Sequence, residues 1–190
     1  MDGVAANDGE AAEGDNIQAD IENFICPTGA YVCTVTGNAL DNTITGSAGS
    51  DVLNGGAGDD TFIMGPNGGI GAGADVISGG AGIDTITFAS FGAVINVIMD
   101  GTASTTMAKK INTDVENLTC PTASACTVTG NASNNKIVGS SAVDTINGMD
   151  GDDNIEGNGG DDAVDCGDGS DLLTGLPTRA TITAPIACEL

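Results

Sequence analysis

The sequence predicts an all-β chain wound into a right-handed parallel β-roll, a form of β-solenoid. A nine-residue phrase, Gly-Gly-x-Gly-x-Asp-x-apolar-x, recurs about ten times along the 190 residues. The eighth position of each copy is a large apolar residue, and the sixth is always Asp or Asn. The composition includes 30 Gly, no Trp, one Tyr and four Phe. These numbers do not favour a thick globular core, whereas a solenoid needs only a thin apolar stripe and local contacts.

The copies of the phrase form two arrays. The first covers residues 37–87 and is interrupted by six extra residues, 64–69, whereas the second runs through 130–174 without interruption. The apolar eighth positions are Ile44, Leu53, Phe62, Ile77 and Ile86 in the first array, and Ile137, Ile146, Ile155, Val164 and Leu173 in the second. A flexible Gly-rich linker has no physical reason to keep this spacing. Both arrays are therefore predicted to be folded.

Each phrase predicts a tight turn followed by a short strand. Its first five positions are rich in Gly, which lets the backbone adopt positive φ angles without a steric penalty. Positions seven to nine place Thr, Val, Ile, Leu or Asn around the apolar residue, as expected for a three-residue strand with alternating faces. Two phrases make one full coil, so strands that are two phrases apart in the sequence should stack. The insert at 64–69 should then loop out of the stack.

The charge of the chain is strongly negative. There are 27 acidic residues, four basic residues and no His, which gives a formal net charge of −23. Self-repulsion on this scale opposes a compact state unless cations neutralise it. Nucleic acid is not expected as a partner, because phosphate binding requires clustered Lys and Arg. The sequence also has no apolar window of about 20 residues, the length required to span a membrane.

The acidic residues are placed where stacked turns would share them. Ca²⁺ takes six to eight oxygen ligands in flexible geometry, which carboxylates and backbone carbonyls can supply. The predicted metal ligands are Asn42, Asp51, Asp60, Asp75, Asp84, Asn135, Asp144, Asp153, Asp162 and Asp171. The two-phrase period pairs Asn42 with Asp60, Asn135 with Asp153, Asp144 with Asp162 and Asp153 with Asp171; with the insert looped out, it also pairs Asp51 with Asp75 and Asp60 with Asp84. This gives up to six calcium sites. Asp153 should serve two of them and Asp51 only one.

In these two arrays the chain resembles the repeats-in-toxin (RTX) family of calcium-binding parallel β-rolls, and the connecting segments resemble it more loosely. The resemblance implies Ca²⁺ as the cofactor and a secreted or cell-surface, extracellular protein. The acidic, Ala- and Gly-rich start suggests an excerpt of a longer secreted protein. The several cysteines are a departure, because many RTX proteins are poor in Cys.

A longer repeat lies over the short one. Ile21-Glu22-Asn23-Phe24 precedes the first array and Val115-Glu116-Asn117-Leu118 precedes the second, and both continue into Cys-Pro-Thr. We therefore expect two modules, 1–99 and 100–190. In the first, a lead-in segment 1–36 precedes the array 37–87; in the second, a lead-in segment 100–129 precedes the array 130–174, and a disulfide-closed cap 175–190 follows it. A strand is expected at 94–99.

The six cysteines allow fifteen pairings, which the sequence alone cannot resolve. Their duplicated placement favours the local pairs Cys26–Cys33, Cys120–Cys126 and Cys166–Cys188. Extending the nine-residue frame backwards puts Cys33 and Cys126 at sixth positions, where Asp would otherwise stand. Each short disulfide is then expected to close the first turn of an array, where no earlier turn can share a calcium ion. Zinc is disfavoured, because there is no His and two distant Cys pairs would have to converge.

The leading functional interpretation is an extracellular structural or adhesive β-roll of a larger secreted or cell-surface protein such as an adhesin. It would fold on binding calcium, and cell-surface glycans or proteins are candidate partners. The alternative is the C-terminal RTX tail of a secreted calcium-dependent enzyme, such as a protease, a lipase or a polysaccharide-modifying enzyme. The chain itself is not expected to be an enzyme, because no nucleophile with a base stands outside the repeats. Ice binding is disfavoured by the mixed Ala, Ser, Asp and Ile at the outward turn positions.

Overall fold

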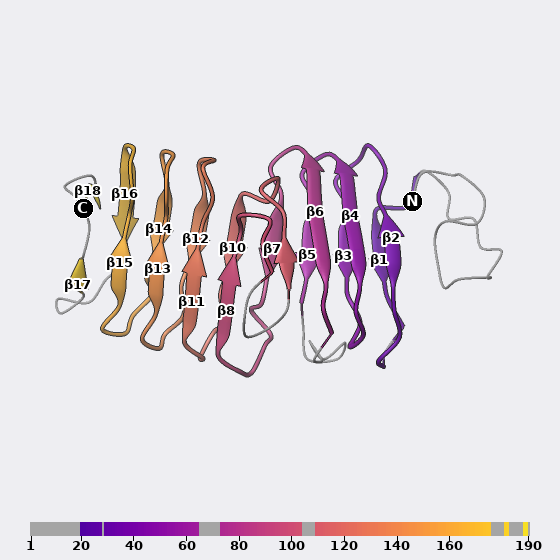
Figure 1. Cartoon of the computed structure of the whole chain (residues 1–190), viewed down its shortest axis with the longest axis horizontal. Coiled ribbons are helices and arrows are strands. Elements are labelled where there is room, and N and C mark those ends of the chain that lie inside the picture. The colour runs from indigo at the N-terminus through magenta and orange to yellow at the C-terminus, as the bar shows by residue number, and fades with distance from the viewer. Residues whose placement is uncertain are drawn as a thin grey trace.

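The computed structural model describes residues 20–27, 29–64, 73–103, 109–175, 181–182 and 188–189. Within these ranges the chain is all β: short strands coil around the long axis of the molecule, from β1 and β2 near one end to β15 and β16 near the other (Figure 1). No helix there is long and apolar enough to cross a membrane. The predicted insert 64–69 apart from Met64, most of the predicted cap 175–190 and the lead-in residues 1–19 lie outside the described residues.

In the part of the chain that the structure describes, the strands form three parallel sheets. The nine-stranded sheet contains, in spatial order, β1 (Asn23–Ile25), β3 (Thr43–Thr45), β5 (Thr61–Ile63), β7 (Thr85–Thr87), β10 (Asn117–Thr119), β12 (Lys136–Val138), β14 (Asn154–Glu156), β16 (Asp171–Thr174) and β18 (Cys188–Glu189). The four-stranded sheet contains β2 (Thr34–Thr36), β4 (Val52–Ala57), β6 (Val76–Ala81) and β9 (Lys110–Ile111). The five-stranded sheet contains β17 (Thr181–Ile182), β15 (Ala163–Asp165), β13 (Thr145–Asn147), β11 (Cys126–Thr129) and β8 (Ile95–Ile98).

The register confirms the predicted period. Strands of the same sheet pair two phrases apart within each array, as in Ile44 with Phe62 and Ile137 with Ile155. Across the insert the separation grows by the length of the insert, and Leu53 pairs with Ile77. The six extra residues therefore leave the register of the coil intact, as the sequence predicted.

The core is a thin stripe inside the coil. All ten predicted eighth-position residues are buried, and the same stripe continues through Val35, Val97, Ile111, Leu118 and Val128 outside the two arrays. In the three-residue strands of the arrays, the central residue points inward and its two neighbours are more exposed. This is the alternation expected of a half-buried strand.

Glycine is required where successive turns stack closely. Gly56 and Gly80 occupy the second position of their phrases and pair across β4 and β6. Both have a φ of 109°, a backbone conformation that side chains disfavour. A Cβ on Gly80 would also collide with the backbone of Gly56, and one on Gly56 with that of Asn38. The turns can therefore stack only because these positions lack side chains.

The two arrays are joined on one side of the roll and separated on the other. The nine-stranded sheet passes without a break from β7 to β10, where Ile86 pairs with Leu118. On the opposite side, the four-stranded sheet ends at β9 and the five-stranded sheet begins at β8. The expected strand at 94–99 is β8, which pairs with β11 of the second array. The division into modules at residues 99 and 100 stays a prediction.

The predicted disulfide pairing is confirmed: Cys26–Cys33, Cys120–Cys126 and Cys166–Cys188 are all bonded. The expectation that no earlier coil precedes Cys126 is wrong, because Ile95 of β8 pairs directly with Cys126. The segment after the first array forms an additional coil before the second. That coil carries an apolar residue, and not a carboxylate, beside Cys126.

Candidate metal centre

The ten predicted metal ligands are all buried, each being at most 2% exposed. Each stands at the sixth position of its phrase, at or just before the start of a strand, where the turn ends and the chain enters the sheet. Burial of so many carboxylates requires partners, because an unpaired charge in a protein interior is strongly unfavourable. Whether these carboxylates are stable in the interior therefore depends on which atoms their oxygens contact.

One oxygen of each paired carboxylate binds the backbone of the preceding coil. The sixth-position N–H of one coil donates to Oδ1 of the sixth-position Asp in the next coil. All six predicted pairs make this contact: Asn42 to Asp60 at 2.7 Å, Asp51 to Asp75 at 2.8 Å, Asp60 to Asp84 at 2.8 Å, Asn135 to Asp153 at 2.7 Å, Asp144 to Asp162 at 2.9 Å and Asp153 to Asp171 at 2.9 Å. The predicted stacking is confirmed.

These contacts organise the sixth positions into three ladders. The continuous ladder runs beside the nine-stranded sheet and consists of Asn42, Asp60, Asp84, Glu116, Asn135, Asp153 and Asp171. The first short ladder runs beside the four-stranded sheet and consists of Cys33, Asp51, Asp75 and Lys109. The second short ladder runs beside the five-stranded sheet and consists of Cys126, Asp144 and Asp162.

The second carboxylate oxygen distinguishes the ladders. Among the described residues, the buried side-chain oxygens without a hydrogen-bond partner are Oδ2 of Asp60, Asp84, Asp153, Asp162 and Asp171, together with Oδ1 of Asp165. Four of them belong to the continuous ladder. An unsatisfied buried oxygen destabilises the fold by about 1–3 kcal/mol, and more when it is charged. These positions therefore call for a cation.

Burial also changes the acidity of these groups. Loss of solvent raises the pKa of Asp60 to about 6, and neighbouring Asp41 and Asp59 add to the effect. Loss of solvent likewise raises the pKa of Asp84 to about 6 and that of Asp153 to about 7. The pKa of Asp84 is raised further by the negative charge of Glu116, and that of Asp153 by Asp171. A bound cation would offset both causes, because an opposite charge nearby favours the ionised carboxylate.

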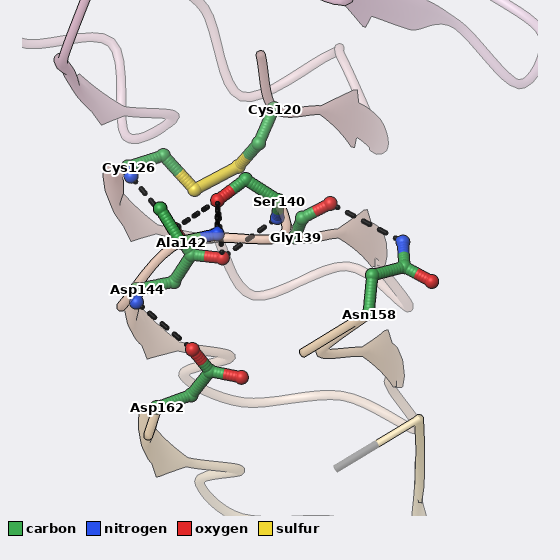
Figure 2. Close-up of a disulfide and its surroundings, with 8 residues drawn as sticks. All are labelled: Cys120, Cys126, Gly139, Ser140, Ala142, Asp144, Asn158 and Asp162. Atoms are coloured by element: carbon green, nitrogen blue, oxygen red, sulfur yellow. Dashed lines mark hydrogen bonds between the residues drawn. A yellow bond between two sulfur atoms is a disulfide. The ribbon is translucent and has the colours of Figure 1, made fainter. Parts of the chain in front are cut away.

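In the short ladders, donors from the chain itself satisfy most of the carboxylates. Ser47 stands at the second position of its phrase, and its N–H and hydroxyl donate to Asp51 at 2.6 and 2.7 Å. Ser140 does the same for Asp144 at 2.7 and 2.9 Å (Figure 2). The N–H groups of Cys33 and Cys126 donate to the same two carboxylates at 2.9 and 2.8 Å. Each Cys thus holds the place in the ladder that the sequence frame assigned to it.

Two residues of the ladders were missed by the sequence reasoning, Glu116 and Lys109. Glu116 accepts a hydrogen bond from the N–H of Asp84 at 2.9 Å through Oε2, and its backbone carbonyl accepts one from the Asn135 side chain at 3.0 Å. It thereby links the part of the continuous ladder in the first array to the part in the second. The sequence held a cue, because Leu118 follows Glu116 by two residues, as the apolar residue follows Asp in every phrase. Lys109 has the same cue, because Ile111 follows it by two residues, but a basic residue stands where the phrase has Asp.

Backbone carbonyl oxygens of the next coil lie close to some of the unpartnered oxygens. A Cβ built on Gly55 would collide with Asp60 Oδ2 and would lie 2.7 Å from the carbonyl oxygen of Gly79 in the next coil. The same combination surrounds Gly148, with Asp153 Oδ2 and the carbonyl oxygen of Cys166. No three acidic or Cys side chains converge on one point within the described residues. A cation here would therefore use carboxylates together with backbone carbonyls, which suits an oxygen-binding ion such as Ca²⁺.

Comparison with known proteins agrees with this geometry. The family model of the RTX calcium-binding nonapeptide repeat matches residues 36–65, 71–87 and 138–173, in four copies. The chain therefore contains RTX calcium-binding repeats. Such repeats bind Ca²⁺, and the matched residues form a calcium-binding β-roll region. No curated protein matches the chain.

Proposed function

We propose that this RTX chain is a calcium-stiffened structural module, in which Ca²⁺ ions bind between stacked turns and make folding dependent on the ion. The unpartnered buried oxygens of the continuous ladder carry this proposal. The proposed ligands are the sixth-position side chains of the continuous ladder, including Glu116, together with Asp162. The other predicted ligands, Asp51, Asp75 and Asp144, have donors from the chain on both oxygens. Asp60, Asp84, Asp153, Asp162 and Asp171 each offer an oxygen that the chain does not satisfy. The backbone carbonyls of adjoining turns supply the remaining ligands.

The role of the metal is structural. Stacked carboxylates repel one another, and the thin apolar stripe offers limited burial to oppose that repulsion. Calcium binding removes the repulsion, so the free energy of binding becomes free energy of folding. The result is a rod whose stiffness depends on extracellular calcium.

We further propose that the rod is part of a secreted or cell-surface protein and presents or spaces an adhesive region. The three disulfides support this location, because such bonds form and persist in oxidising compartments. The alternative, a tail that helps a secreted enzyme to fold, uses the same ion-dependent roll. The full-length gene discriminates between the two, because an adjoining catalytic domain would favour the enzyme tail.

Removal of calcium is the direct test of ion-dependent folding. In a chelator the chain should be largely disordered, and about millimolar Ca²⁺, typical of extracellular modules, should restore the β spectrum by circular dichroism. Mg²⁺ at the same concentration is the control, because its smaller octahedral shell fits a carbonyl-rich turn poorly. An unchanged β spectrum after verified metal removal would contradict the proposal.

The adhesive role needs its own assay. Binding of the chain to cells or to an array of glycans should be measured in calcium and in chelator. Binding that requires both the ion and the folded roll would support an adhesive module. If the calcium-loaded chain binds neither cells nor glycans, the structural role stands and the adhesive one is withdrawn.

A further inference from the structure

Lys109 is a buried basic residue placed where the pattern otherwise puts an acid. Its side chain is 2% exposed, whereas the neighbouring Lys110 is exposed. The pairing of Lys110 with Val76 sets Lys109 directly beside Asp75, at the sixth position of the following coil. A buried lysine of this kind requires a specific partner, because an isolated ammonium in the interior is strongly unfavourable.

The Lys109 ammonium makes contacts of the type that a calcium ion makes. Its Nζ forms a short ion pair with Asp75 Oδ2 and donates to the carbonyl oxygen of Gly73 at 3.3 Å. Asp75 Oδ1 meanwhile accepts the N–H of Asp51 at 2.8 Å. Both oxygens of Asp75 therefore have donors from the chain. A carboxylate and a turn carbonyl are also the ligands proposed for the metal elsewhere in the roll.

The opposite side of the same coil provides a built-in comparison. There the first array ends with Asp84, and the next coil supplies the carboxylate of Glu116. Asp84 Oδ2 remains buried and unpartnered. In this coil, one side thus places an ammonium against Asp75, the last Asp of the first short ladder, and the other side places the carboxylate of Glu116 beside Asp84.

We propose that the Lys109 ammonium permanently replaces a calcium ion at the end of the first short ladder. This inference rests on the proposed function, since it assumes that the other stacked turns bind calcium. The ammonium is covalently attached, so it neutralises Asp75 at any calcium concentration. The first array is therefore tied to the next coil on this side without an ion, while the Asp84 side requires one. The chain has converted one metal position into an ion pair of its own.

The test replaces Lys109 by a neutral side chain of similar length. In Lys109→Met the carboxylate of Asp75 and the carbonyl of Gly73 lose their cation, and calcium should bind there. We expect one more calcium ion per folded chain than in wild type, measured by metal analysis after gel filtration in saturating calcium. Folding of the variant should also require more calcium than folding of the wild type, followed by circular dichroism. Lys110→Met is the matched control and should resemble wild type in both measurements.

A double variant separates the role of the charge from that of packing. In Lys109→Met/Asp75→Asn both charges of the pair are removed, so no extra calcium should bind and the count should return to that of wild type. A folded Lys109→Met with the wild-type calcium count would overturn the proposal. Failure of Lys109→Met to fold even in saturating calcium would also overturn it, because calcium would then be unable to replace the ammonium. A wild-type chain that binds no calcium would instead refute the proposed function.

Discussion

The continuous ladder and the first short ladder are built from the same repeated phrase, yet they satisfy their carboxylates differently. Along the continuous ladder, Asp60, Asp84, Asp153 and Asp171 each keep a buried oxygen without a donor. In the first short ladder, Ser47 and Lys109 supply donors to Asp51 and Asp75 from within the chain. The two ladders lie on opposite sides of one coil and share its register. The phrase fixes where a carboxylate stands, but not what neutralises it.

The difference depends on two positions outside the Asp itself. A Ser at the second position of the phrase satisfies the carboxylate of its own turn, whereas Gly56 and Gly80 have no side chain to contribute. The sixth-position residue of the next coil either adds another carboxylate, as Glu116 does, or a cation, as Lys109 does. Whether a turn needs a calcium ion to neutralise its carboxylate can thus differ from one turn to the next while the fold stays the same.

The largest expected effect of a single substitution comes from Asp153 in the continuous ladder. Asp153 stacks between Asn135 and Asp171, so Asp153→Ala would remove a ligand from two of the proposed calcium positions. Asp51→Ala is the matched change in the first short ladder, where both carboxylate oxygens already have donors. We expect Asp153→Ala to lose about two ions, and Asp51→Ala to keep the wild-type count while losing stability. Calorimetric titration with calcium, checked by metal analysis of the folded chains, measures both.

This comparison also tests whether hydrogen-bond satisfaction decides where calcium binds. Asp51→Ala leaves buried N–H groups of Cys33 and Ser47 without an acceptor, which should lower the free energy of unfolding by about 1–3 kcal/mol. In this variant the stability should therefore fall while the number of bound calcium ions stays the same. Equal losses of ions in the two variants would show that hydrogen-bond satisfaction does not decide where calcium binds.

A smaller effect is expected at the junction between the arrays. Glu116→Gln keeps a hydrogen-bond acceptor for the N–H of Asp84 but removes the negative charge beside the unpartnered Asp84 oxygen. We expect the loss of about one calcium ion with the fold retained. Glu156→Gln is the control, because Glu156 stands at a half-buried ninth position outside the ladders. If both variants bind as many ions as wild type, Glu116 is a structural spacer and the continuous ladder contains two separate calcium arrays.

Much of this architecture could be predicted from the sequence, because the repeat is local. The positions of Ile44 and Asp60 in their phrases determine the strand, the inward face and the stacking partner two phrases away. The junction could not be predicted in the same way. Asp84 meets Glu116 across 32 residues and Asp75 meets Lys109 across 34, through a segment that lacks the Gly-rich phrase. Where the period is lost, pairing depends on loop lengths that no local pattern encodes.

Substitutions at Cys33 and Cys126, the first residues of the two short ladders, are expected to have the smallest effect on the number of bound calcium ions. Cys33 and Cys126 stand at sixth positions and offer an N–H to the next Asp, but they contribute no carboxylate. The disulfides Cys26–Cys33 and Cys120–Cys126 close short loops, which should each contribute roughly 2 kcal/mol by restricting the unfolded chain. Cys26→Ser/Cys33→Ser should therefore lower stability and leave the calcium count unchanged. The longer Cys166–Cys188 bridge should contribute roughly 3 kcal/mol.

Hydrogen exchange after reduction locates the effect within the roll. Amides next to the bonded cysteines should exchange faster, such as the N–H of Cys26, which donates to Thr45, and that of Cys120, which donates to Val138. Amides in the middle of the continuous ladder, such as the N–H of Asp153, should stay protected as long as calcium is present. Loss of protection along the whole ladder on reduction would mean that the disulfides, and not the ions, hold the coils together. In that case the stability of this fold would not depend on whether the carboxylates of a ladder bind calcium or accept hydrogen bonds from the chain.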